Sequence, residues 1–141
     1  MNIEFDLITP FFLGAKDVFE QLFLSDVSVS EISTIQTDRT QTDITVSIEI
    51  TSSSFSGKVY YFMEDSFVFT ILNILLGYVP ERDLNTEMTR SALLELNNMI
   101  TGKALTKLSE MGTNYNMSPP EIIDGKGSKM TMEPVSLSVG T

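Results

Sequence analysis

Three residues that can do chemistry, and a glycine after them, follow one another along the chain at the spacing of a single helix face. Ser91, Glu95, Asn98 and Gly102 are separated by four, three and four residues. Because a helix turns by about 100° per residue, these positions fall within an arc of about 60°. Such a row presents a hydroxyl, a carboxylate, a carboxamide and a position without a side chain. It suits docking onto another protein and holding a water molecule at the contact.

The carboxamide and the carboxylate are the two groups with the clearest chemical use. An amide has a donor end and an acceptor end, so Asn98 could hold a water in one orientation, as a glutamine does in some GTPases. Glu95 could pair with a lysine of the partner and fix the docking geometry. A glycine such as Gly102 inside a helix lowers helix stability by about 1 kcal/mol relative to alanine. The close approach of another surface would explain why a glycine stands there.

Each of these residues also has an ordinary interpretation. Exposed glutamates and asparagines on helices are usually only solvated, and Ser91 could be a neutral surface residue. Gly102 could admit a neighbouring helix of the same molecule. We interpret Met88, Met99 and Met111 as core filler rather than as a binding surface. The spacing alone therefore leaves the function open.

The chain contains no histidine and no cysteine. It therefore lacks the ligands of a usual structural zinc site, a Ser–His nucleophile and an imidazole base. Any chemistry must use carboxylates, amides, hydroxyls, lysines or a metal borrowed from a partner. We interpret Asp83, Glu87 and Glu110 as solvated or helix-dipole charges, so the sequence predicts no metal site of its own.

The charge of the chain restricts its partners. Nineteen acidic residues against nine basic ones give a net charge of −10. A field of that sign repels phosphate backbones and anionic lipids, so we expect neither nucleic acid nor a membrane as partner. The N-terminus lacks the basic and apolar segments of a signal peptide, and the apolar stretch 67–79 is shorter than the roughly 20 residues that a bilayer requires. We expect a cytoplasmic protein.

The helices that must position the site follow from periodicity and from start and stop signals. We predict one domain over residues 1–141. The row of polar residues lies in a predicted helix over 86–111 that ends at Gly112. A helix over about 10–24 is predicted to start at Thr9-Pro10. A third, over 66–76, is apolar nearly all round, so we expect most of it to be buried.

The strands complete the fold class. Residues 43–51 alternate strictly between apolar and polar, which predicts a half-buried strand, and 58–63 should pair with it. Further strand candidates are 27–35, 121–123 and 130–139. This order of elements predicts a two-layer α+β domain with long helices packed on a mostly antiparallel sheet.

The pattern Ser91-x3-Glu95-x2-Asn98, followed further along by Pro119-Pro120, resembles the signature of the CheC/CheX/FliY family of chemotaxis phosphatases. The likeness is strongest from about residue 57 to 126. Some members carry a second Glu and Asn pair in their first helix, but here Leu24 stands where that Asn would be needed. A single site in the second half of the chain resembles a CheX-like member.

The resemblance implies a CheC-like fold and hydrolysis of the phosphoryl-aspartate on a CheY-like response regulator receiver domain. Asn98 would orient the attacking water, and Glu95 would pair with the receiver's lysine. Ser91 and Gly102 would shape the contact surface. The receiver would bring its own Mg²⁺, so no cofactor is expected in this chain. A homodimer is also implied, and we expect strands near the C-terminus to mediate it.

Two other functions are compatible with the same fold. The domain could hold a receiver without dephosphorylating it, as a flagellar-switch or adaptor module. It could also belong to a stress or regulatory protein that uses the domain for another purpose. Phosphate release from a phosphorylated receiver separates the enzyme from both alternatives.

Overall fold

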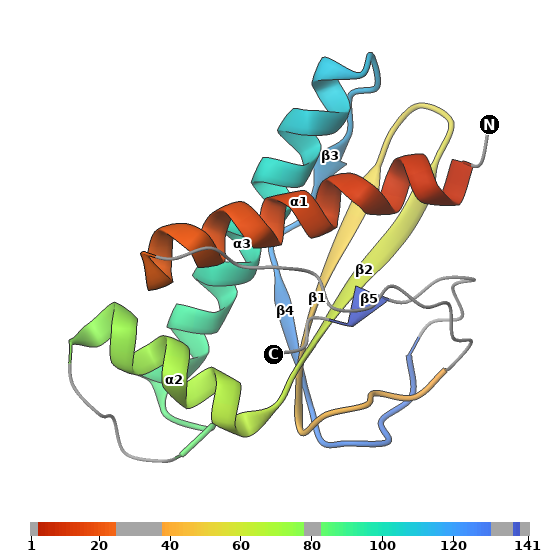
Figure 1. Ribbon diagram of the computed structural model, residues 1–141. Coiled ribbons are helices and arrows are strands. Elements are labelled where there is room, and N and C mark those ends of the chain that lie inside the picture. Colours follow the sequence, from red (N-terminus) through yellow and green to blue (C-terminus); the bar gives the residue numbers. More distant parts are fainter. Residues whose placement is uncertain (1–2, 25–37, 78–82, 131–136, 139–141) are drawn as a thin grey trace.

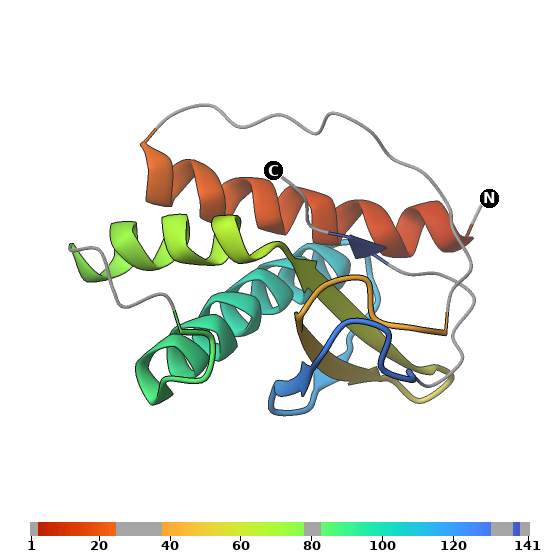
Figure 2. The same ribbon diagram turned by 90° about the horizontal axis from the view of Figure 1, so that it is seen from below.

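The computed structural model describes residues 3–24, 38–77, 83–130 and 137–138. Its helices are α1 (Ile3–Phe23), α2 (Asp65–Leu76) and α3 (Glu87–Glu110). Its strands are β1 (Ile44–Thr51), β2 (Ser56–Met63), β3 (Asn116–Met117), β4 (Glu121–Asp124) and β5 (Leu137–Ser138). The three helices pack on one side of a single sheet (Figures 1 and 2). The predicted two-layer α+β architecture is confirmed.

The sheet is built around the hairpin of β1 and β2. These strands are antiparallel, with Ile44 opposite Met63 and Thr51 opposite Ser56. The strand order is β3-β1-β2-β5, and β4 also pairs with β1. β3 and β4 run antiparallel to β1, whereas β5 runs parallel to β2, so the predicted mostly antiparallel sheet is confirmed. Of the strand expected over 130–139, only Leu137–Ser138 is described as a strand, and the candidate at 27–35 lies outside the described residues.

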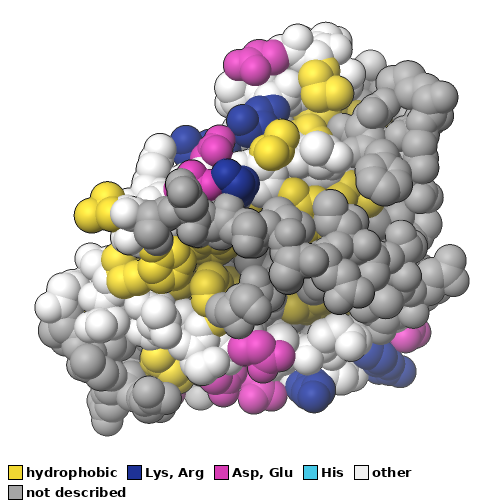
Figure 3. Space-filling view, in the orientation of Figure 1, with side chains coloured by type: hydrophobic (Ala, Val, Ile, Leu, Met, Phe, Trp, Pro, Cys, Tyr) yellow, Lys and Arg dark blue, Asp and Glu magenta, His cyan; other side chains and the backbone are white. Residues whose placement is uncertain are grey.

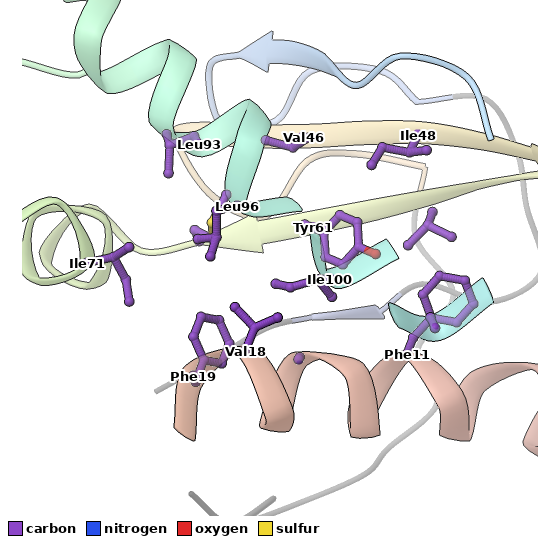
Figure 4. Close-up of a cluster of buried hydrophobic side chains, with 14 of the residues drawn as sticks. Phe11, Val18, Phe19, Val46, Ile48, Tyr61, Ile71, Leu93, Leu96 and Ile100 are labelled. Atoms are coloured by element: carbon purple, nitrogen blue, oxygen red, sulfur yellow. The ribbon is translucent and has the colours of Figure 1, made fainter. Parts of the chain in front are cut away.

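The main core lies between the sheet and the helices, with α3 closest to the sheet (Figure 4). The side chains that meet there include Ile44, Val46 and Ile48 of β1, Leu93, Leu96 and Ile100 of α3, and Phe11, Val18 and Phe19 of α1. Burying each such side chain contributes about 1.5–3 kcal/mol. Because this apolar stripe holds one side of α3 against the sheet, the opposite side of the helix is presented outward.

The second face of β1 differs from the prediction of a half-buried strand. Thr45 is 0% exposed and Ser47 is 7% exposed. A smaller apolar cluster, which includes Phe62 and Met130, lies on this face with Ile123 packed against it. Thr45 stands between Phe62 and Ile123 in the paired strands. The residues that cover this face come from distant parts of the chain, so the alternation within β1 could not reveal them.

The predicted start of the first helix at Thr9-Pro10 is wrong. α1 already begins at Ile3, and Pro10 lies inside it. Leu7, one turn before Phe11, packs against the main core and extends the apolar stripe toward the N-terminus. Proline inside a helix removes one backbone hydrogen bond, but the packing of the preceding turn continues the helix through it.

The second helix matches its predicted bounds but not its predicted burial. It ends at Gly77, whose φ of 76° is left-handed and whose N–H donates to the carbonyl of Asn73. The buried side chains are Phe67, Val68, Phe69, Ile71 and Leu72. Ile74 and Leu75 are 36% and 42% exposed. The predicted burial of most of α2 is therefore wrong, although Leu76 at its end still packs against the core.

The two glycines inside helices have opposite surroundings. α1 crosses α3 at Gly14, where an added Cβ would lie 2.9 Å from the carbonyl oxygen of Ile100 and 3.2 Å from the amide nitrogen of Ala104 (Figure 1). A Cβ at Gly102 would meet no atom of the described residues within 4 Å. The residue that admits a neighbouring helix is therefore Gly14, and that interpretation of Gly102 is wrong.

This contrast predicts opposite stability effects for the same substitution. Gly14→Ala should lower the free energy of unfolding by about 1–3 kcal/mol, because its methyl group overlaps the α3 backbone. Gly102→Ala should raise the free energy of unfolding by up to about 1 kcal/mol, because alanine favours the helix and has room there. Urea denaturation of both variants measures the difference. If both substitutions stabilised the protein, the close crossing of α1 and α3 would be wrong.

Candidate functional site

The helix that carries the predicted site has clear boundaries. The N-cap Thr86 accepts a hydrogen bond from the backbone N–H of Thr89 at 3.1 Å. The helix ends at Glu110, just before Gly112, whose φ of 98° interrupts helical geometry. The predicted helix over 86–111 is confirmed as one continuous element.

The side chains of the predicted catalytic pair lie away from the core. Glu95 is exposed and Asn98 is half-buried, whereas Leu96 and Ile100 are only 2% and 1% exposed. Among the described residues, neither Glu95 nor Asn98 has a side-chain hydrogen bond or ion pair. Both groups are therefore available to a molecule that binds from outside.

Glu95 and Asn98 border an open groove of about 630 Å³. Ser91, Glu95 and Asn98 form its α3 side, and the segment 117–120 forms the other side. Asn98 and Pro119 are 21 residues apart in the sequence, so the fold unites the distant parts of the predicted pattern. Gly102 lies outside this groove and lines a neighbouring hollow between α1 and α3.

The wall opposite Asn98 is fixed to the sheet by Ser118. Its backbone N–H donates to the carbonyl of Glu49 at 2.9 Å, and its hydroxyl accepts from the N–H of Glu49 at 2.9 Å. Pro119 and Pro120 follow directly, and their rings limit backbone rotation. The sequence did not predict that Ser118 pairs with Glu49 of β1, because the two-residue strand β3 before it has no periodicity of its own.

A second anchor joins α3 to the end of the same wall. Arg90 donates to both carboxylate oxygens of Asp124, at 2.9 and 3.1 Å. This hydrogen bonding lowers the pKa of Asp124 and raises the pKa of Arg90 from their usual values. The stretch 118–124, which includes the wall at 118–120, is thus held to β1 at Ser118 and to α3 at Asp124.

The Arg90–Asp124 pair predicts a pH-dependent stability. The pKa of Asp124 is lower in the folded than in the unfolded state, so the pair stabilises above the unfolded pKa and is lost as the pH falls through the folded one. Asp124→Asn should therefore lower the free energy of unfolding by less than about 1 kcal/mol at pH 7, because the pair is exposed. The difference from the wild type should begin to shrink below about pH 4 and should vanish once the pH has fallen below the lowered pKa of folded Asp124, as thermal denaturation at several pH values can measure. An equal difference at pH 3 and pH 7 would contradict this assignment.

The two consecutive asparagines of α3 have different surroundings. Asn97 is 1% exposed, and its amide donates to the carbonyl of Leu93 at 2.8 Å. Thr101 donates to the carbonyl of Asn97 at 2.8 Å and shares a 2.6 Å hydrogen bond with the hydroxyl of Tyr61. Burial raises the pKa of Tyr61 well above its usual value, so the phenol stays protonated. These buried groups link α3 to β2 beneath the groove, while Asn98 faces into it.

The interpretation of three methionines as core filler is wrong. Met88, Met99 and Met111 are 51%, 42% and 58% exposed. Met99 follows Asn98 and lies one turn after Glu95, on the side of α3 that the sheet does not cover. The methionine pattern alone could not distinguish a buried from an exposed helix face.

Two further properties concern the described residues only. No group of three or more of their acidic side chains is placed to hold a metal ion. None of the helices they form is long and apolar enough to cross a membrane. That Mg²⁺ arrives with a partner stays a prediction.

The family model for "Chemotaxis phosphatase CheX" matches residues 44–138. This chain belongs to the CheX family. The matched region contains β1, all of α3 and the segment 117–120, and therefore both sides of the groove. The resemblance seen in the pattern around Glu95 and Asn98 is thereby confirmed at the level of the family.

Individual relatives resemble this CheX-family chain in sequence or in three-dimensional structure. The CheY-P phosphatase CheX of Thermotoga maritima is 26% identical over 79 residues, which are 56% of this chain and 50% of that protein. The chain thus spans about half the length of this relative. A CheC-like superfamily protein from Shewanella sp. PV-4 is 23% identical with a TM-score of 0.80, over 94% of this chain and 84% of that one. In the CheX–CheY–BeF3–Mg²⁺ complex from Borrelia burgdorferi, the matching chain is 23% identical with a TM-score of 0.62, over 84% of this chain and 76% of that one. The predicted CheC-like fold is confirmed.

Proposed function

We propose that this CheX-family chain hydrolyses the phosphoryl-aspartate of a CheY-like receiver domain. The observation that carries the proposal is the groove in which Glu95 and Asn98 stand side by side, opposite Pro119 and Pro120, with no hydrogen bond or ion pair to any described residue. The relative from Thermotoga maritima is named as a CheY-P phosphatase, and the Borrelia burgdorferi CheX was solved with CheY, BeF3 and Mg²⁺. These relatives support the choice of substrate class.

Asn98 is the group proposed to orient the attacking water. Its carboxamide oxygen can accept a hydrogen bond from the water, and its NH₂ group can donate one to an oxygen of the phosphoryl group. The water oxygen then faces phosphorus in line with the bond that breaks. Asn98 is half-buried, which limits its rotamers before the substrate arrives. The aspartate carboxylate leaves and inorganic phosphate forms, so this chain needs no nucleophile of its own. Positioning is its contribution to the rate.

Glu95 is proposed to dock the receiver. It lies three residues before Asn98, so both side chains reach the same site. When the receiver covers the groove and excludes water, an ion pair between Glu95 and the receiver's lysine becomes stronger. The receiver supplies Mg²⁺ for the phosphoryl charge, which is why no cofactor is assigned to this chain. Ser91, one turn earlier, extends the contact at the end of the groove.

Phosphate release tests the proposal. Receiver domains from the same organism are phosphorylated with acetyl phosphate and Mg²⁺, freed of the donor, and mixed with the protein. We expect the phosphorylated form of at least one receiver to decay faster than it does alone. If a receiver binds but decays at its own rate, the chain is a receiver-binding module, such as a flagellar-switch or adaptor domain, and not an enzyme.

The edge of the sheet suggests how two copies associate. Among the described residues, only Leu137 and Ser138 pair with the outer edge of β2, opposite Tyr61 and Phe62. Open strand edges favour pairing, so we expect a two-fold homodimer that uses the region of β5 and the free part of β2. Sedimentation equilibrium measures the state directly. A monomer at high protein concentration would contradict this prediction.

A further inference from the structure

Hydrogen bonds cross the core from β2 to the backbone of α3 beside Asn98. The hydroxyl of Tyr61 lies 2.6 Å from the hydroxyl of Thr101, which donates to the carbonyl of Asn97 at 2.8 Å. Thr101 has one hydroxyl proton and gives it to Asn97, so Tyr61 is the donor to Thr101. We call these three groups the Tyr61 link. The carbonyl of Asn97 belongs to the peptide group that joins Asn97 to Asn98, so the link ends at the backbone of the proposed catalytic residue.

The Tyr61 link is sealed from water. Tyr61 and Thr101 are 1% and 0% exposed. The ring of Tyr61 stands in the main core together with Ile100 (Figure 4). Because water does not reach these groups, it cannot take the place of a hydroxyl that is removed. A buried hydrogen bond of this kind is also stronger and more directional than one at the surface.

The other contacts of α3 fix its orientation less strictly. Apolar side chains such as Leu96 pack against the sheet, and the hydrophobic effect has no preferred direction. The ion pairs that join α3 to α1 and to β4 lie at the surface. Figure 3 shows basic and acidic side chains together at the surface where α1 crosses α3. Such exposed pairs contribute little and are screened by salt, so the buried link is the stricter constraint on the rotation of α3.

Both walls of the groove are fixed to the same hairpin. Ser118 holds the wall at 118–120 to Glu49 of β1 through two hydrogen bonds of 2.9 Å. Tyr61 of β2 holds the α3 wall through the link. β1 and β2 pair directly, with Tyr61 opposite Val46. Hydrogen bonds thus place Asn98 and the opposite wall relative to one pair of strands.

We infer that Tyr61 and Thr101 are positioning residues for the reaction proposed above, and this inference rests on that proposed function. Alignment of a water in line requires the carboxamide of Asn98 to be held within about 0.5 Å. Apolar packing alone does not ensure this, because cores lose unique packing before they lose stability. The link holds the peptide group of Asn97 and Asn98 in one position relative to β2. Its loss therefore lowers the rate of hydrolysis and leaves receiver binding nearly unchanged.

Removal of one hydroxyl at a time tests the inference. Tyr61→Phe and Thr101→Val keep the shape of the side chains. Each should lower the single-turnover rate with saturating protein roughly 10-fold, with receiver affinity within about twofold of the wild type. Thr101→Ser keeps the hydroxyl and should stay within about threefold of the wild-type rate. The double variant should be no slower than the slower single variant, because both changes remove the same link.

A matched control separates positioning from a general loss of stability. Tyr61→Phe should lower the melting temperature by about 2–4 °C. Ile71→Val trims a buried side chain of α2, a helix that takes no part in the link, and should lower the melting temperature by a similar amount without loss of rate. Without any receiver, the backbone amide resonance of Asn98 should shift in Tyr61→Phe and stay in place in Ile71→Val.

The outcomes distinguish this inference from the proposed function. If Tyr61→Phe and Thr101→Val hydrolyse the phosphoryl-receiver as fast as the wild type does, the link only stabilises the fold, and only this inference is overturned. If Ile71→Val loses as much rate as Tyr61→Phe, the rate follows stability and the inference is again overturned. If the wild type does not accelerate hydrolysis, the proposed function itself fails and the inference falls with it.

Discussion

Replacing Asn98 with alanine is expected to lower the rate of receiver dephosphorylation by about 100-fold while changing receiver affinity by less than about threefold. The water that the amide orients is aligned mainly in the transition state, so its loss affects turnover more than binding. Asn98 is half-buried and bonded to no described residue, so the variant should fold normally. Turnover and affinity are measured on the same preparation, by phosphate release and by titration.

One further variant of Asn98 and two variants of other asparagines show whether the effect is specific to the carboxamide of Asn98. Asn98→Asp keeps the size but loses the NH₂ donor and brings negative charge toward the phosphoryl group, so it should be at least as damaging as alanine. Asn73→Ala changes an exposed asparagine of α2 and should leave turnover unchanged. Asn97→Ala removes a buried amide, so it should lower stability by about 1–3 kcal/mol. Wild-type turnover in Asn98→Ala would exclude the proposed role.

Glu95→Ala is expected to impair both docking and rate. The receiver's lysine loses its counter-charge in a closed interface, and such charged hydrogen bonds contribute about 1.5–3 kcal/mol, or roughly 10- to 150-fold in affinity. The matched control is Glu87→Ala, which removes an exposed glutamate from the first turn of the same helix, outside the groove. Calorimetric titration with the BeF3- and Mg²⁺-loaded receiver measures the loss.

A charge exchange tests the partner of Glu95. If Glu95 pairs with the receiver's lysine, Glu95→Lys combined with a lysine-to-glutamate change in the receiver should recover part of the affinity that either change removes. Additive losses in this double-mutant cycle would show that the two groups do not meet. The docking role of Glu95 would then be wrong, although a role in hydrolysis would still be open to test.

Local signals were sufficient to predict the element that carries the site. Thr86 caps α3 and Gly112 ends it, so its predicted bounds differ from the observed ones by a single residue at each end. Helical periodicity alone placed Glu95 away from the buried side that carries Leu96 and Ile100. The alternation of β1 and the apolar run of β2 similarly located the hairpin on which α3 packs.

Properties that depend on distant contacts could not be predicted. Gly14 and Gly102 both stand in helices, and only the crossing of α1 over α3 shows which one the fold requires. The alternation of β1 predicts that Thr45 faces solvent, but Thr45 is buried on the face that carries the cluster with Phe62. Thr9-Pro10 has the sequence of a helix start, but α1 begins earlier because the preceding turn packs against the core. In each case tertiary packing outweighs a local preference of about 1 kcal/mol or a few times that.

The site itself was only partly accessible from the sequence. The resemblance joined Glu95, Asn98 and Pro119 into one pattern, and the groove brings the three together. Two contacts that hold the opposite wall, Ser118 with Glu49 and Arg90 with Asp124, had no sequence signal, because the two residues of each contact are more than 30 positions apart. Gly102 belongs to the helix face but not to the groove, a distinction that required the position of α1.

The central claim is that Asn98 accelerates hydrolysis of a bound phosphoryl-receiver, and a single-turnover experiment tests it most directly. The phosphorylated receiver is mixed with saturating wild-type protein or saturating Asn98→Ala, so that binding no longer limits the rate, and its decay is followed beside that of the receiver alone. We expect decay to be at least about 100-fold faster with the wild type and to fall to the rate of the free receiver with Asn98→Ala. Equal acceleration by both proteins, or acceleration by neither, would contradict the proposed mechanism.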